Sequence, residues 1–154
     1  MLLSDRLDPA FRERLMLAVT AVNQCRYCSY AHARMALLAG LSAQEIQALQ
    51  DSAIDGAPSE QLPALMYAQH WTEASGEPDP QARQRLISIY GVQAASAIEL
   101  TLRLIHAANL LGNTFDYLLY RLSFGRWGYQ ASAPHEQTNR VNNQTTAKPD
   151  SISR

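Results

Sequence analysis

The stretch RERLMLAVTAVNQCRYCSYAHARMALLAGLSAQEIQAL, residues 12–49, decides the fold class. Apolar residues in its first half recur every three or four positions, which is the period of an α-helix. Asp8-Pro9, just before it, is typical of a helix start, because aspartate caps free backbone N–H groups and proline suits the first helical position. The pattern therefore predicts a helix from this point to about Asn23.

The second half of the stretch predicts two more helices. One begins at Gln24 or Cys25 and runs to Leu38, where Gly40 supplies a common C-terminal signal. The sequence SAQE at 42–45 then fits a capping box, which opens a short helix that completes the stretch.

Outward from this stretch, the same signals predict helices along most of the chain. They are expected over residues 59–74, 80–91 and 92–124, the last with a candidate interruption at Gly112-Asn113. No segment alternates polar and apolar residues as a strand would. We therefore predict an all-α fold, a compact helical domain of about six or seven helices over residues 1–129. A poorly ordered polar tail is expected at 130–154.

The composition fits one globular domain and excludes several classes of protein. Of the 154 residues, 47% are apolar and 18% are charged, and the formal net charge is −1. This balance offers no electrostatic footprint for nucleic acid or an acidic membrane surface, so neither is expected as a partner. The N-terminus has no basic stretch followed by an apolar core, so no signal peptide is predicted.

The longest apolar tract, residues 92–111, raises two questions: whether it spans a membrane and whether it contacts a second copy of the chain. It contains polar and ionisable side chains that are too costly for a helix facing lipid, namely Gln93, Glu99, Arg103 and His106. We therefore expect a soluble, cytoplasmic protein. One small domain would struggle to cover this helix on every side, so it forms either the centre of the core or a homo-oligomeric interface.

Cys25, Cys28 and His32 lie at positions i, i+3 and i+7, on one face of the second predicted helix. Near a helix start the dipole stabilises a thiolate, and a nearby imidazole can take the thiol proton. This predicts redox chemistry, in which a thiolate attacks a peroxide and the sulfenic acid condenses with the other thiol. We assign the attack to Cys28, one turn from His32, and expect Cys25 to be better exposed. Helix position alone also allows the reverse assignment.

Two other interpretations of the cysteine pair stay open. The cysteines can be small buried apolar residues. C-x2-C-x3-H can also bind zinc, but the fourth ligand would have to come from elsewhere, from Glu13, His70, His106 or His135. We predict neither a metal nor a cofactor.

The pattern E-x11-C-x-Y-C-x3-H resembles the signature of the AhpD-like alkylhydroperoxidases, in the carboxymuconolactone decarboxylase superfamily. It is formed by Glu13, Cys25, Tyr27, Cys28 and His32, and the resemblance covers about residues 8–49. It implies an antioxidant, thiol-dependent peroxidase in which Glu13 and His32 form a proton relay. The relay deprotonates Cys28, and Cys25 is the resolving cysteine. From the sequence alone, Glu13 reads as an ordinary exposed helix residue between two arginines.

The resemblance also implies partners and assembly. Proteins like this are all-helical, form trimers or hexamers, reduce a hydroperoxide substrate, and draw electrons from a dithiol or lipoylated carrier protein. Tyr27 occupies a slot where some members have a second histidine of the relay, so a shorter proton path is expected here. Members without the cysteine pair act on a muconolactone, and the presence of both cysteines argues against that branch.

The remaining candidates carry less weight. Tyr27 and His70 are candidate pocket residues, although His70 fits a helix surface better. His106 reads as a hydrogen-bonded core residue. Two other functions stay open: a carboxymuconolactone decarboxylase-like lyase that keeps its cysteines unused, and a non-enzymatic thiol redox sensor.

Overall fold

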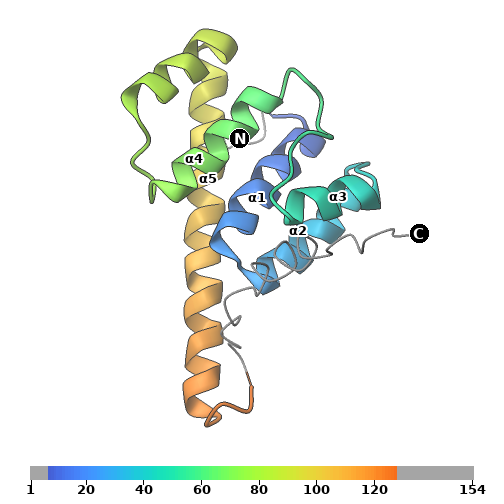
Figure 1. Cartoon of the computed structure of the whole chain (residues 1–154), viewed down its shortest axis with the longest axis vertical. Coiled ribbons are helices and arrows are strands. Elements are labelled where there is room, and N and C mark those ends of the chain that lie inside the picture. Colours follow the sequence, from blue (N-terminus) through green and yellow to red (C-terminus); the bar gives the residue numbers. More distant parts are fainter. Residues whose placement is uncertain (1–6, 128–154) are drawn as a thin grey trace, which may run out of the picture.

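The computed structural model describes residues 7–127 and is all-helical over that range, with no strand. Its helices are α1 (Pro9–Asn23), α2 (Arg26–Leu38), α3 (Ala43–Gln50), α4 (Leu62–Glu73) and α5 (Pro80–Leu122) (Figure 1). The prediction of an all-α fold is confirmed. The tail predicted at 130–154 lies outside the described residues.

The predicted number of helices, six or seven, is wrong, because residues 7–127 form five. Residues 80–122, predicted as two or three helices, count as the one element α5, which consists of two helical segments joined at a kink. Gly91 has a non-helical backbone, with φ 77° and ψ 162°, but helical geometry resumes directly after it. Glycine tolerates this φ at little cost, so the predicted boundary between residues 80–91 and 92–124 is present as a kink between two helical segments. Gly112 does not interrupt the helix.

The predicted helix starts are largely confirmed. The side chains of Asp8, Ser42 and Asp79 accept hydrogen bonds from backbone N–H groups two or three residues later, at 3.1, 3.1 and 2.8 Å. Each of these bonds satisfies a donor that the first helical turn leaves unpaired. α4 differs, because it begins at Leu62 rather than Ser59 and has no side-chain cap.

Helix α1 lies at the centre of the molecule and contacts each of the other four helices (Figure 1). One of its faces packs with α4 and α5 in the larger core cluster, which includes Leu15, Leu65 and Ile98. The opposite face packs with α2 and α3 in a smaller cluster that includes Leu17 and Ile46. Because both faces are packed, α1 is a fixed platform for the side chains that it carries.

Helix α5 is longer than the body on which it packs. In Figure 1 its C-terminal half, drawn in orange, extends past α2 to the bottom of the view. Residues 110–122, here called the α5 arm, expose many large apolar side chains: Leu110, Leu111, Phe115, Tyr117, Leu118, Tyr120 and Leu122. No helix between residues 7 and 127 combines the length and the hydropathy that a membrane span requires.

Candidate redox site

A sharp turn between α1 and α2 positions the cysteine pair. Gln24 follows α1 in the left-handed conformation, with φ 53° and ψ 37°, and Cys25 is the N-cap of α2. Cys25 Sγ accepts a hydrogen bond from the Cys28 backbone N–H at 3.4 Å. The two cysteines form a disulfide, with their Cα atoms 5.3 Å apart. The pair therefore lies at the positive end of the α2 dipole, where a thiolate formed on reduction is stabilised.

The two cysteines differ in exposure, in the order opposite to the prediction. Cys25 is 1% exposed, whereas Cys28 is only partly buried. The expectation that Cys25 is the better exposed residue is wrong, because Cys25 lies in the interhelical turn that α5 covers. Cys28 lies one turn into α2 and keeps an open side.

Gly112 brings α5 into contact with both sulfur atoms. A Cβ added to this glycine would lie 2.8 Å from Cys25 Sγ and 3.4 Å from Cys28 Sγ. One turn earlier on α5, the Ala108 carbonyl oxygen lies 3.9 Å from Cys28 Sγ. The sequence marked Gly112 only as a candidate interruption. A glycine inside a helix costs about 1 kcal/mol relative to alanine. Its presence within a predicted helix is the signal that could have pointed to a close approach at this position.

Glu13 and His32 meet across the interface of α1 and α2. His32 Nδ1 lies 2.8 Å from Glu13 Oε2, and Glu13 is 2% exposed. An ionised carboxylate can only accept a hydrogen bond, so Nδ1 carries the proton and Nε2 is left to accept one. The interpretation of Glu13 as an exposed residue is wrong, because α2 packs over that face of α1. The family resemblance alone singled this residue out.

The second oxygen of Glu13 is less well satisfied. Oε1 is buried and has no hydrogen-bond partner among the described residues, and Arg12 Nε lies 3.8 Å from it. The side chain also lines a shallow cavity of about 230 Å³ with Met35 and Leu38 of α2. A buried carboxylate oxygen that lacks a donor is costly, and functional sites are where such groups recur.

Polar contacts fasten the end of α1 to α5 beside the cysteine pair. Asn113 Nδ2 donates to the Asn23 carbonyl oxygen at 2.8 Å, and Thr20 Oγ1 donates to Asn109 Oδ1 at 3.3 Å. Asn23 Nδ2 lies 3.0 Å from His106 Nδ1. His106 is therefore hydrogen-bonded, as predicted, and belongs to this α1–α5 contact.

The comparison with known families concerns the first half of the chain. The sequence model of the carboxymuconolactone decarboxylase family matches residues 1–74, which include Glu13, both cysteines and His32. Over these residues the chain is similar to this family. The AhpD-like proteins are part of the same superfamily, so the resemblance is confirmed over these residues. Neither a curated protein nor a solved structure matches the chain.

The matched segment does not contain the whole candidate site. It ends at residue 74, just after α4, so α5 lies outside it. Gly112 and Ala108, which contact the cysteine pair, therefore come from a part of the chain that the family match does not cover.

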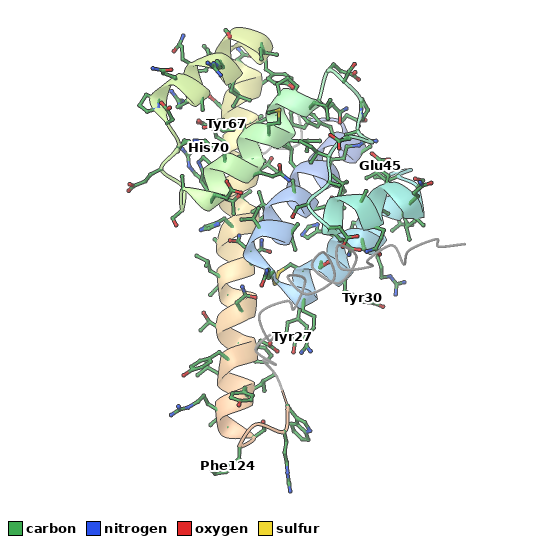
Figure 2. The ribbon with its side chains drawn as sticks, viewed as in Figure 1. Tyr27, Tyr30, Glu45, Tyr67, His70 and Phe124 are labelled. Carbon is green, nitrogen blue, oxygen red and sulfur yellow. A yellow bond between two sulfur atoms is a disulfide. The ribbon has the colours of Figure 1, made fainter. Side chains whose placement is uncertain are left out.

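The two candidate pocket residues lie apart from each other. The Tyr27 hydroxyl donates to Asp116 Oδ1 at 2.9 Å, so this side chain is directed toward α5. His70 lines a cavity of about 300 Å³ between α4 and the first part of α5. In Figure 2 His70 lies on α4 beside Tyr67, well above Tyr27 on α2. The cavity beside Cys25 does not include His70, so the structure does not bring this histidine to the cysteine pair.

A polar cavity of about 480 Å³ opens beside Cys25. Its walls come from the end of α1, the start of α2 and the end of α3, and include Thr20, Arg26 and Ser29. Gln50 Nε2 donates to Ser29 Oγ at 2.7 Å and so fixes one wall. The volume is within the range of small-molecule sites. Between residues 7 and 127, no group of three or more His, Cys, Asp or Glu side chains is arranged to hold a metal ion.

A second buried carboxylate, Glu99, joins α4 to α5. Its Oε1 accepts hydrogen bonds from the Tyr67 hydroxyl at 2.9 Å and from Arg83 Nε at 2.8 Å. Burial acts to raise the pKa of Glu99, but the hydrogen bonds from Arg83 and Tyr67 outweigh it and hold this pKa below its usual value. Burial, then the hydrogen bond to Glu99, raises the pKa of Tyr67. The cluster stabilises the packing of α4 on α5.

Proposed function

We propose that this chain is a thiol-dependent peroxidase of the AhpD-like type. The observation that carries the proposal is the 2.8 Å contact between Glu13 of α1 and His32 of α2. Cys25 and Cys28 lie at the start of the same helix as His32. A carboxylate that holds the Nδ1 proton of a histidine leaves Nε2 as a base, and a thiol near a helix start is the group that such a base activates.

In the reduced protein, His32 Nε2 accepts the proton of the Cys28 thiol, and Glu13 stabilises the imidazolium that results. The Cys28 thiolate attacks one oxygen of the hydroperoxide, and the O–O bond breaks. The sulfur becomes a sulfenic acid, and the departing alkoxide takes the proton from His32 and leaves as an alcohol. Cys28 suits this step because its side chain is the more exposed of the two.

The thiol of Cys25 then attacks the Cys28 sulfur, and water leaves as the disulfide forms. An external dithiol closes the cycle by giving two electrons and two protons to the disulfide. Because Cys25 is 1% exposed, the incoming thiolate reaches Cys28 Sγ first and Cys25 is the leaving group. A dithiol or lipoyl-type carrier is the class of donor that fits this chemistry.

Hydroperoxide consumption with dihydrolipoamide as donor tests the proposal. Cys28→Ser is expected to abolish turnover, and His32→Ala to slow it by about two to four orders of magnitude, the usual range for a general base. His70→Ala is the matched control, because this histidine lines a different cavity, and its turnover should stay at the wild-type value. Wild-type turnover in Cys28→Ser would refute the proposal.

A lyase is the second candidate, and one observation favours it: the matched family takes its name from a decarboxylase. Activity on a lactone that survives the Cys25→Ser/Cys28→Ser double substitution would support this function. A redox sensor would instead show a change of assembly on oxidation, together with negligible peroxide turnover.

We also infer that the chain assembles as a homo-oligomer through the α5 arm. Leu111 and Leu118 are 72% and 50% exposed, and Leu122 is 77% exposed. Apolar side chains gathered in this way on a projecting helix are typical of a protein–protein interface. A second copy can bury the same surface in return, which is how symmetric oligomers close.

A further inference from the structure

Asp116 joins the cysteine motif to α5. Its Oδ1 accepts hydrogen bonds from the Tyr27 hydroxyl at 2.9 Å and from Arg26 Nη2 at 3.0 Å. Arg26 Nη2 also lies 3.1 Å from the Tyr27 hydroxyl, which closes a triangle of polar contacts. Arg26 and Tyr27 are the two residues between the cysteines, so both intervening side chains end on one carboxylate.

The contacts of α5 with the motif form a stripe along one helix face. Ala108, Gly112 and Asp116 follow one another at intervals of four residues, so they lie one above the other, about one turn apart. The Ala108 carbonyl lies against Cys28 Sγ, and Gly112 lies against both sulfur atoms. Asp116, which is 8% exposed, is therefore one turn from the residue that touches the disulfide.

We propose that Asp116 is a positioning residue that shifts the redox equilibrium of the Cys25–Cys28 pair toward the disulfide. It holds the first turn of α2 against α5 and so keeps the two sulfurs close together. Its negative charge also offsets that of Arg26, which would otherwise stabilise a thiolate. Both effects disfavour the reduced form and make the disulfide harder to reduce. The inference rests on the proposed function only in taking the pair to be redox-active.

The other ionisable groups around the motif have different surroundings. Glu13 of α1 is paired with His32 of α2. Asp51, at the end of α3, lines the polar cavity beside Cys25. Asp116 differs from both, because it binds the side chains of the motif itself and does so from α5.

The test is thiol–disulfide equilibration of the full chain with mixtures of reduced and oxidised dithiothreitol. The dithiol gives two electrons and two protons to the protein disulfide and becomes a cyclic disulfide, and the oxidised fraction is read by mass after alkylation. Asp116→Asn should shift the equilibrium about tenfold toward the reduced protein, which corresponds to about 30 mV. Tyr27→Phe should shift it less, in the same direction, and Asp116→Glu should restore most of the wild-type value. Asp55→Asn, which removes an exposed acid of the α3–α4 loop, is the matched control and should leave the equilibrium unchanged.

The expected tenfold change in the equilibrium constant corresponds to about 1.4 kcal/mol. A constant for Asp116→Asn that differs less than about twofold from that of Asp55→Asn would therefore overturn the inference. If Asp116→Asn does not fold, as judged by circular dichroism, Tyr27→Phe decides, and an unchanged constant in that variant overturns it. The assay contains no peroxide. A chain that fails as a peroxidase can therefore still show the shift, and an active peroxidase can fail to show it.

Discussion

Alanine at position 112 would place a methyl group against the sulfurs of the cysteine pair. The new Cβ would lie 2.8 Å from Cys25 Sγ, a separation that side chains cannot keep, so the sulfurs or α5 must move. α5 resists, because Asn113 beside this position donates to the Asn23 carbonyl oxygen at 2.8 Å. We expect the strain to appear at the disulfide.

The size of the effect depends on the redox state. Overpacking of this kind costs about 1–3 kcal/mol. Alanine in a helix interior returns about 1 kcal/mol relative to glycine. In the oxidised protein the disulfide holds both sulfurs in place, so the full cost applies. In the reduced protein each thiol can rotate away from the new methyl group, so the overpacking cost is largely avoided. The stabilisation that alanine gives a helix relative to glycine remains. The free energy of unfolding should therefore fall by about 1–3 kcal/mol more in the oxidised than in the reduced state.

Thermal melts of Gly112→Ala and wild type, with and without reductant, measure this difference. At about 2–4 °C per kcal/mol, the oxidised variant should lose several degrees more than the reduced one. Gly56→Ala is the matched control, because a Cβ at Gly56 meets nothing within 4 Å. Equal shifts of Gly112→Ala in the two redox states would refute the reasoning, since they would place the strain away from the sulfurs.

Three further predictions concern the relay, the buried carboxylate and the arm. Glu13→Gln should lower peroxide turnover by about a hundredfold, because it removes the charge that stabilises the His32 imidazolium, whereas the exposed Glu73→Gln should not change it. Glu99→Gln should destabilise the protein by about 1–3 kcal/mol near neutral pH. The pKa of Glu99 is lowered in the folded state, so its contribution is present above its ordinary pKa of 4.5 and is lost as the pH falls through the folded-state pKa. Melts of both proteins should therefore converge below that pH, and a constant gap would contradict this. Leu118→Glu should dissociate the oligomer in sedimentation experiments, and a monomeric wild type would rule out assembly through the arm.

Much of the fold could be predicted from the sequence because its helix signals are local. Asp8 and Ser42 act through contacts within one turn, and the structure shows both side chains capping their helices. The break at Gly91 was also predictable, because glycine readily adopts a backbone conformation that does not occur within a helix. The sequence did not show that the two helical segments follow each other directly as α5, which packs on α1 and α4.

The geometry of the site depended on contacts between distant segments. Glu13 is flanked by arginines, and nothing local shows that α2 covers it. Cys25 looked like the accessible end of a helix until α5 was placed against it. Asp116 and Gly112 are more than 80 positions from the cysteines, a distance at which spacing carries no information. The residue types of the chemistry were therefore predictable, whereas their burial and their neighbours on α5 were not.

The central place of α1 has a consequence for amide hydrogen exchange. A helix packed on both faces opens only when the whole domain opens, so its amides should be among the slowest to exchange. Glu13 is on this helix, whereas the cysteines are in the turn that follows it and in the first turn of α2. The base-orienting carboxylate should therefore belong to a strongly protected segment of residues 7–127, and the sulfurs lie at its border. Reduction and reoxidation can loosen that border repeatedly while the carboxylate stays in place.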